Sequence, residues 1–347
     1  MNRAWCFVRL FLMMSVFFTL VITACNLPLT PVKKSTTLPP TNIPINQPTE
    51  QPTTVSPTVQ AHILLPISHT GQAQTIHDQD NKKYANQKRA YGGDEYLKGR
   101  FERPFDRNMT YLGYLDIIKS TMIRNDPSFI FVTIQVASPL DSAEENPAYY
   151  GLELDLNLDG RNRYLIQGTQ PLSEDWTVDG VDVWESTSSE IPLAQSNTGI
   201  PVTGTVGFDV SLLKSGKGDD IDLAWIRKSP GLADTIEIAF KNTLVGGEKG
   251  KFIWRPFTDG APFEPLFYDL QTSFSLEQAG SPLIEDANYP LKAVYAVDNT
   301  CRVASGYTAT GREPGICPQP VPQVEQEEPE QQQVPENPFV LPPPSHR

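Results

Sequence analysis

The chain has 347 residues, of which 20% are charged and 39% apolar, and it carries 32 Pro and a formal net charge of −13. The apolar content suffices for a buried core, which excludes a wholly disordered chain. The acidic balance excludes nucleic acid as the main partner, because phosphate binding needs clustered Lys and Arg. With four Cys and four His, dense disulfide or zinc frameworks are excluded as well.

Residues 1–24 have the pattern of an export signal. Arg3 and Arg9 supply positive charge at the start, and residues 10–22 (LFLMMSVFFTLVI) form a mostly apolar run. That run is shorter than the roughly 20 residues of a membrane-spanning helix. The segment therefore predicts export and cleavage.

The end of this segment, Ile22-Thr23-Ala24-Cys25, resembles the lipobox of bacterial lipoproteins. The resemblance implies that Cys25 receives a diacylglyceryl thioether and becomes the new N-terminus. Two or three acyl chains anchor a protein stably, whereas one chain gives only marginal binding. We therefore expect a lipid anchor in the cell membrane, facing the extracytoplasmic side. The alternative is an ordinary secreted protein cut near Ala24.

Two Pro-rich segments flank the rest of the chain. The predicted tether, 25–60, holds 8 Pro and 8 Thr in the 35 positions after Cys25. The tail, 318–347, holds 9 Pro, 6 Gln and 5 Glu in 30 positions. Such compositions cannot build a core and favour extended, solvated backbone, so both segments are predicted to be disordered.

A lead-in segment, 61–104, is locally basic, with seven Lys and Arg between positions 82 and 103. One interpretation is a patch that touches anionic cell-wall polymer or lipid headgroups. The other is a solvated lead-in that packs against the acidic domain that follows it.

Residues 105–317 show a two-residue hydrophobic period, which is typical of half-buried strands. Apolar residues alternate with polar ones over 130–136, 152–158, 221–225 and 236–240, and Asp-Gly, Asp-Pro and Gly-Gly turns separate such runs. Leu152 to Leu158 is predicted as one strand. The pattern predicts an all-β fold, an antiparallel β-sandwich of the jelly-roll or immunoglobulin-like type.

Three runs in this region, 115–136, 149–166 and 206–213, resemble the strands of DOMON-like domains and family 9 carbohydrate-binding modules. The resemblance implies a sandwich whose ligand is a sugar or haem. Haem iron would need a His among the strands, but the four His are His62, His69, His77 and His346. The same absence removes Ser-His-Asp and Cys-His catalysis from the predicted sandwich.

The acidic residues suggest two candidate metal sites. The run from Asp155 to Asn162 fails the EF-hand pattern, because position 12 would be Ile166. A structural calcium ion held at the turn by Asp159 and Asn162 stays open as an alternative. The group Asp219, Asp220 and Asp222 is a second candidate.

Sugar binding needs an exposed aromatic ring on which a pyranose can stack. Trp225 and Trp254 lie on apolar faces and are predicted to be core residues. Trp184 shares its face with Asp182, and Trp176 lies in a turn-rich stretch, so Trp176 and Trp184 are the candidate ligand-binding residues. Ordinary packing is the alternative for both.

Cys301 and Cys317 enclose 15 residues and are predicted to form a structural disulfide, because thiols oxidise outside the membrane. No spacing singles out a catalytic pair of carboxylates. The sequence thus favours a lipid-anchored, non-catalytic module that binds carbohydrate or cell-envelope polymer. A glycoside hydrolase with paired carboxylates and a structural surface protein are the alternatives.

Overall fold

Two antiparallel β-sheets form the fold, as the two-residue period predicts. The computed structural model describes residues 61–67, 71–142, 148–187, 207–262 and 274–319, which belong to one unit, Val59–Arg347. The predicted signal peptide and tether, with Cys25, and residues 320–347 of the predicted tail lie outside this description.

The first sheet has five strands in the order β1-β3-β4-β11-β10. All four pairings in it are antiparallel. The bounds of its strands are β1 Gln74–His77, β3 Ile117–Ile123, β4 Phe129–Val136, β10 Ala224–Lys228 and β11 Thr235–Lys241.

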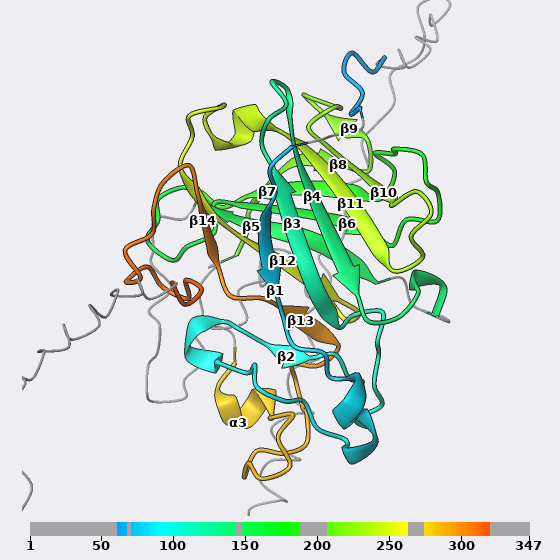
Figure 1. The fold of residues 1–347 in the computed structure, drawn as a ribbon, viewed down its shortest axis with the longest axis vertical. Coiled ribbons are helices and arrows are strands. Elements are labelled where there is room, and N and C mark those ends of the chain that lie inside the picture. Colours follow the sequence, from blue (N-terminus) through cyan, green and yellow to red (C-terminus); the bar gives the residue numbers. More distant parts are fainter. Residues whose placement is uncertain (1–60, 68–70, 143–147, 188–206, 263–273, 320–347) are drawn as a thin grey trace, which may run out of the picture. The chain divides into compact units, whose positions relative to one another are not determined.

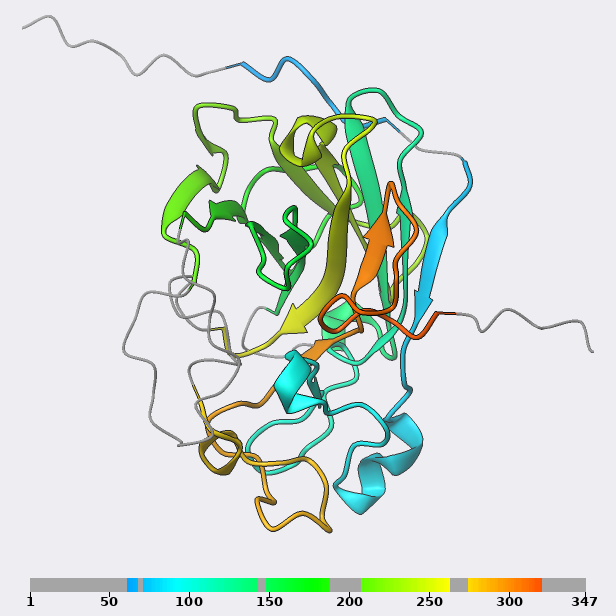
Figure 2. The ribbon, with the colours of Figure 1, turned by 90° about the vertical axis from the view of Figure 1, so that its left-hand side faces the viewer.

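The second sheet has nine strands, with the path β2-β13-β12-β5-β6-β7-β8-β9 and with β14 also paired to β12. In Figure 1, β3, β4 and β11 lie in front of β5 and β6, and Figure 2 shows the same strands after a 90° turn. The bounds of its strands are β2 Glu102–Arg103, β5 Tyr149–Asp155, β6 Tyr164–Thr169, β7 Val181–Glu185, β8 Val210–Lys214, β9 Lys217–Gly218, β12 Phe252–Asp259, β13 Val297–Asn299 and β14 Val303–Ser305.

The main core lies between the sheets. Alternate side chains of β4, such as Val132 and Ile134, pack in one cluster with Leu152 and Leu154 of β5, and each is at most 1% exposed. Trp254 of β12 joins this cluster, as predicted for a core residue. Burial of this apolar surface is the main favourable term for folding, at about 25 cal/mol per Å². The predicted β-sandwich is confirmed.

Helical segments are short. The single α-helix of the described residues, α3 (Leu276–Ala279), begins with a capping box in which Ser275 and Gln278 exchange side-chain and backbone hydrogen bonds. The 3-10 helices are η2 Lys82–Gln87, η3 Tyr96–Lys98, η4 Leu140–Ser142 and η5 Asn242–Val245. No helix in the described part is long and apolar enough to span a bilayer.

The predicted strand over Leu152 to Leu158 ends earlier, at Asp155. The Asp155 carboxylate accepts hydrogen bonds from the backbone N–H groups of Asn157, Leu158 and Gly160 at 2.8–3.0 Å. Leu158 adopts a φ of 63° inside this turn. Local side-chain capping of the backbone therefore overrides the leucine alternation, because it offers the N–H groups partners outside the sheet.

The basic lead-in contributes to both sheets. β1 forms an edge of the five-stranded sheet, and β2 forms an edge of the nine-stranded sheet. Because β1 ends at His77, the prediction that no His lies among the strands is wrong. Its basic side chains pair with nearby carboxylates, as in Arg89–Glu285 at 2.8 Å, Arg103–Asp94 at 3.0 Å and Lys98–Glu95 at 3.2 Å. Of these three pairs, Arg89–Glu285 joins the lead-in to the region after residue 104, and the other two lie within the lead-in. The lead-in is part of the sandwich, and its β1 and β2 pack against later strands, so it is not a separate solvated segment.

The predicted disulfide between Cys301 and Cys317 is present, with Cα atoms 4.9 Å apart. Arg302, next to Cys301, also pairs with Ile316 in a parallel bridge. The bond therefore fastens the last described stretch of chain to the start of β14.

Candidate functional site

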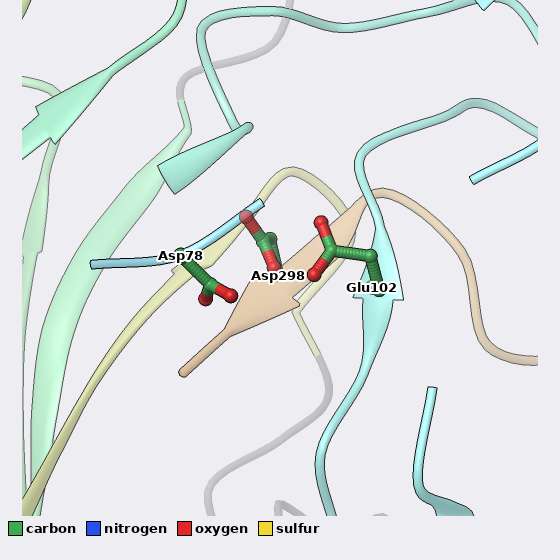
Figure 3. Close-up of side chains that lie close together, drawn as sticks. All are labelled: Asp78, Glu102 and Asp298. Carbon is green, nitrogen blue, oxygen red and sulfur yellow. The ribbon is translucent and has the colours of Figure 1, made fainter. Parts of the chain in front are cut away.

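A buried group of carboxylates, which we call the acidic cluster, lies where the lead-in meets the two sheets. Its members are Asp78 after β1, Glu102 in β2, Asp298 in β13 and Asp116 before β3. Figure 3 shows the carboxyl groups of Asp78, Glu102 and Asp298 directed toward one another. Each of these three offers one oxygen, and the three oxygens lie within 4.8 Å of one another.

The strand pairing explains part of this convergence. In the β13–β2 ladder, Asp298 stands directly opposite Glu102. Residues opposite each other in an antiparallel pair project to the same face, and like charges in that position are destabilising. Asp78 reaches the same place because its backbone N–H donates to the carbonyl of Ile118 in β3.

Solvent is excluded from the cluster. Glu102, Asp116 and Asp298 are 0% exposed, and so is the side chain of Asp78. Burial raises the pKa of Asp78 to about 6 and that of Asp116 to about 7, since a carboxylate loses its hydration in a low-dielectric interior. Burial, reinforced by the neighbouring carboxylates, also raises the pKa values of Glu102 and Asp298 well above the usual range.

Each carboxylate uses one of its oxygens within the protein. Asp78 Oδ1 lies 3.0 Å from Arg100 Nη2, and Asp298 Oδ2 accepts from the backbone N–H of Ile117 at 2.6 Å. Glu102 Oε1 accepts from the side-chain amide of Asn81.

One oxygen of the Asp116 carboxylate is likewise bound by donors in the protein. Its Oδ2 accepts from the Tyr111 hydroxyl at 2.5 Å and from the backbone N–H of Asn81 at 2.9 Å. The other oxygen of every member of the acidic cluster is buried and has no hydrogen-bond partner among the described residues; these are Asp78 Oδ2, Glu102 Oε2, Asp116 Oδ1 and Asp298 Oδ1.

Chemically, the acidic cluster is a set of hard oxygen donors. Such donors suit Ca²⁺ or Mg²⁺ and are poor ligands for soft metals, which prefer thiolate or imidazole. The sequence did not reveal this site, because its members come from four separate segments with no shared motif. An Asp-x-Asp pair at Asp78 and Asp80 was the one local hint.

Trp184, the first candidate for sugar stacking, lies in β7 on the outer face of the nine-stranded sheet. The ring is half-buried and packs against an apolar cluster of Leu165, Phe208 and Phe257. Lys214 Nζ lies 5.9 Å from the ring centroid, a cation–π contact. The polar residues Gln167 and Asp182 stand opposite each other in the neighbouring row of the same face.

Trp176, the second candidate, lies on the outer face of the other sheet. Its ring centroid is 6.1 Å from that of Phe131, and the Arg227 guanidinium carbon lies 4.4 Å from its centre. Trp225 packs in the same outer cluster and is 2% exposed, as predicted for a core residue. Because Trp176 and Trp184 belong to opposite faces of the sandwich, they do not form a common stacking platform.

At the turn with Asp159 and Asn162, which the sequence suggests as a candidate calcium site, arginine side chains contact both candidate ligands. Asp159 Oδ2 pairs with Arg161 at 2.7 Å, and the side-chain oxygen of Asn162 accepts from Arg302 Nη2 at 2.6 Å. The two candidate oxygens therefore have cationic partners from the protein.

The group Asp219, Asp220 and Asp222 also has partners. Asp220 pairs with Lys241 at 2.6 Å, and Asp222 accepts from the His62 ring and from two backbone N–H groups of the segment 61–67. This segment is thereby held beside β10, with the His62 ring 4.7 Å from that of Trp225.

Comparison with protein-family models, with curated proteins and with solved structures finds no match to this chain.

Proposed function

We propose that this protein is a lipid-anchored, extracytoplasmic lipoprotein whose β-sandwich binds carbohydrate or cell-envelope polymer without catalysis. The anchor is Cys25, and the Pro/Thr-rich tether after it holds the sandwich away from the membrane. The Cys301–Cys317 disulfide supports an oxidising compartment, since such bonds are rare in the cytosol.

The observation that carries the binding proposal is the surface around Trp184. This surface combines a half-buried indole with ammonium, carboxylate and hydroxyl groups on adjacent positions of β7 and β8. A sugar has an apolar face that packs on a ring and hydroxyl groups that need donors and acceptors beside it. Binding sites commonly pair such an aromatic surface with a few polar groups that fix orientation. The polar neighbours are Asp182, Ser211 and Lys214, while Gln167 beside them is buried.

A glycoside hydrolase is less well supported. Its two carboxyl groups must reach the glycosidic bond of a polymer, at a separation of about 5–9.5 Å. Among the described residues, the acidic cluster is the group of three or more carboxyls whose oxygens lie within 4.8 Å of one another, and its side chains are shut off from solvent. Buried carboxyls cannot protonate a glycosidic oxygen outside.

The test uses the full chain, purified in detergent, on an array of bacterial and plant oligosaccharides and on isolated peptidoglycan. We expect binding that Trp184→Ala weakens about tenfold, which corresponds to about 1.4 kcal/mol, because the variant removes the ring on which the sugar packs. Trp176→Ala, on the opposite face, is the matched control and should bind like the unmodified chain.

Lys214→Ala, which leaves the ring in place, should weaken binding without changing the melting temperature. If no probe binds, or if Trp176→Ala abolishes binding while Trp184→Ala does not, the proposed surface is wrong. A chain that binds nothing would favour the structural surface protein.

A further inference from the structure

We propose that the acidic cluster binds one calcium ion, which fastens the lead-in segment to both sheets of the sandwich. The ligands we assign are the unpartnered oxygens of Asp78, Glu102 and Asp298, with Asp116 beside them. This site is distinct from the Trp184 surface, and its argument does not depend on sugar binding.

The charge of the acidic cluster favours a bound cation. Four carboxylates lie together in a region without solvent. In the described part of the chain, the one ion pair between a cluster member and a cationic side chain is that of Asp78 with Arg100. Charges in the interior need partners, because burying an uncompensated carboxylate costs far more than a neutral group. A divalent cation supplies the missing positive charge in a single position.

The hydrogen bonding of the carboxylate oxygens also favours a bound cation. Polar atoms in protein interiors are nearly always hydrogen-bonded, and an exception calls for a specific reason. Here four buried carboxylate oxygens lack partners, one on each member of the cluster. The second oxygen of each member is already held by a protein donor, which fixes the orientation of the carboxylate. This arrangement leaves one oriented, acceptor-only atom per residue.

The distances between the ligand oxygens fit one calcium ion. Calcium binds oxygen at about 2.3–2.6 Å, so two ligands on opposite sides of the ion lie about 4.6–5.2 Å apart. The ligand atoms of Asp78, Glu102 and Asp298 lie within 4.8 Å of one another, so one ion can touch all three. Magnesium is less suited, because it demands near-ideal octahedral geometry at about 2.0–2.1 Å, whereas calcium accepts irregular arrangements of oxygens at longer distances.

The position of the cluster gives the ion a mechanical role. Asp78 follows the edge strand β1 of the five-stranded sheet, while Glu102 and Asp298 belong to β2 and β13 of the nine-stranded sheet. An ion bound to all three would tie the edges of both sheets together. Calcium would then stabilise the folded state by mass action, because the unfolded chain has no such site.

The test measures metal content and thermal stability of the full chain. After dialysis in millimolar CaCl₂, elemental analysis should find one tightly held calcium per chain. The melting temperature should be several degrees higher in millimolar CaCl₂ than in EDTA, and millimolar MgCl₂ should give a smaller rise.

Two variants locate the ion. Asp298→Asn and Glu102→Gln each remove one negative charge while keeping the side-chain shape and the protein hydrogen bond. In EDTA they should melt at or above the temperature of the unmodified chain, because like-charge repulsion is relieved; in CaCl₂ they should lose most of the calcium response. Asp259 is a buried carboxyl outside the cluster, so Asp259→Asn is the matched control and should keep the calcium response of the melting temperature.

Absence of bound calcium together with an unchanged melting temperature would overturn the proposal. Protonation of the carboxyl groups would then be what neutralises the acidic cluster. A calcium response that persists in both Asp298→Asn and Glu102→Gln would also overturn it, since the ion would then lie elsewhere. If one of these variants does not fold, the other decides the outcome.

Discussion

Asp298 in β13 accepts a 2.6 Å hydrogen bond from the backbone N–H of Ile117, the first residue of β3. The two residues belong to different sheets, so a single carboxylate joins the two layers at the edge of the sandwich. Both are 0% exposed, which makes the contact a structural one.

Asp298→Ala should therefore destabilise the protein, in contrast to Asp298→Asn. Alanine leaves the buried N–H of Ile117 without an acceptor, at a cost of about 1–3 kcal/mol, whereas asparagine retains an oxygen for it. Urea unfolding of both variants in EDTA checks this expectation. Equal stability of the two variants would show that the hydrogen bond does not matter.

Arg103 is a buried cation whose loss should be more damaging. It is 0% exposed, pairs with Asp94 at 3.0 Å, and donates to the backbone carbonyls of Ala279, Gly280 and Val294. Arg103→Met would strand a mostly buried carboxylate and three carbonyls, which we expect to cost about 3–5 kcal/mol in the free energy of unfolding.

The control for Arg103 is Arg161→Met, which breaks a more exposed ion pair with Asp159. Such pairs contribute about 0–1 kcal/mol, so urea denaturation should show little change for this variant. A similar loss for both variants would contradict the argument from burial.

Asp259 should make stability depend on pH. Burial raises the pKa of this carboxyl from 3.8 to about 7. Between these two pKa values the folded state keeps a proton that the unfolded chain releases. The contribution of Asp259 to the free energy of unfolding is therefore fully present below the unfolded pKa, and it is lost as the pH rises through the folded pKa.

Asp259→Asn removes that dependence. At constant calcium concentration, the variant and the unmodified chain should be equally stable near pH 3.8. Above pH 7 the variant should be more stable, by an amount on the order of a few kcal/mol, because each pKa unit corresponds to about 1.4 kcal/mol. The exposed Asp175→Asn is the control. A stability difference that stays constant from acid to neutral pH would contradict the prediction.

The Cys301–Cys317 bond should contribute measurably to stability. It closes a loop with a sequence separation of 16, for which the chain-entropy model gives about 3 kcal/mol. The double variant Cys301→Ser/Cys317→Ser should lose this amount in urea denaturation. Adding a reductant should destabilise the unmodified chain and leave the double variant unchanged; a reductant effect on both would point to another target.

Cys25 should carry the lipid in the native protein. Mass spectrometry of the membrane-extracted chain should find residue 25 at the N-terminus with a diacylglyceryl thioether, and Cys25→Ser should abolish this modification. Cys6→Ser, inside the predicted signal, is the control and should leave it intact. An unmodified mature N-terminus at another residue would refute the anchor.

The sequence alone was sufficient for the fold class and for the disulfide. Alternating residues such as those of 130–136 reveal strands because the two-residue period is a local property of an extended backbone. Cys301 and Cys317 are close in sequence and are the two remaining thiols of the predicted mature chain. The strand end at Asp155 was missed, since capping by a side chain competes with the leucine pattern.

Only the tertiary structure decided which side chains meet. Asp78 and Asp298 are separated by more than half of the chain, and nothing local to either residue encodes their approach. Trp176 and Trp184 are eight positions apart in sequence, yet they lie on opposite outer faces because the chain crosses from one sheet to the other between them. Hydrophobic period records which face of its own strand a residue occupies; strand order and register determine what lies across from it.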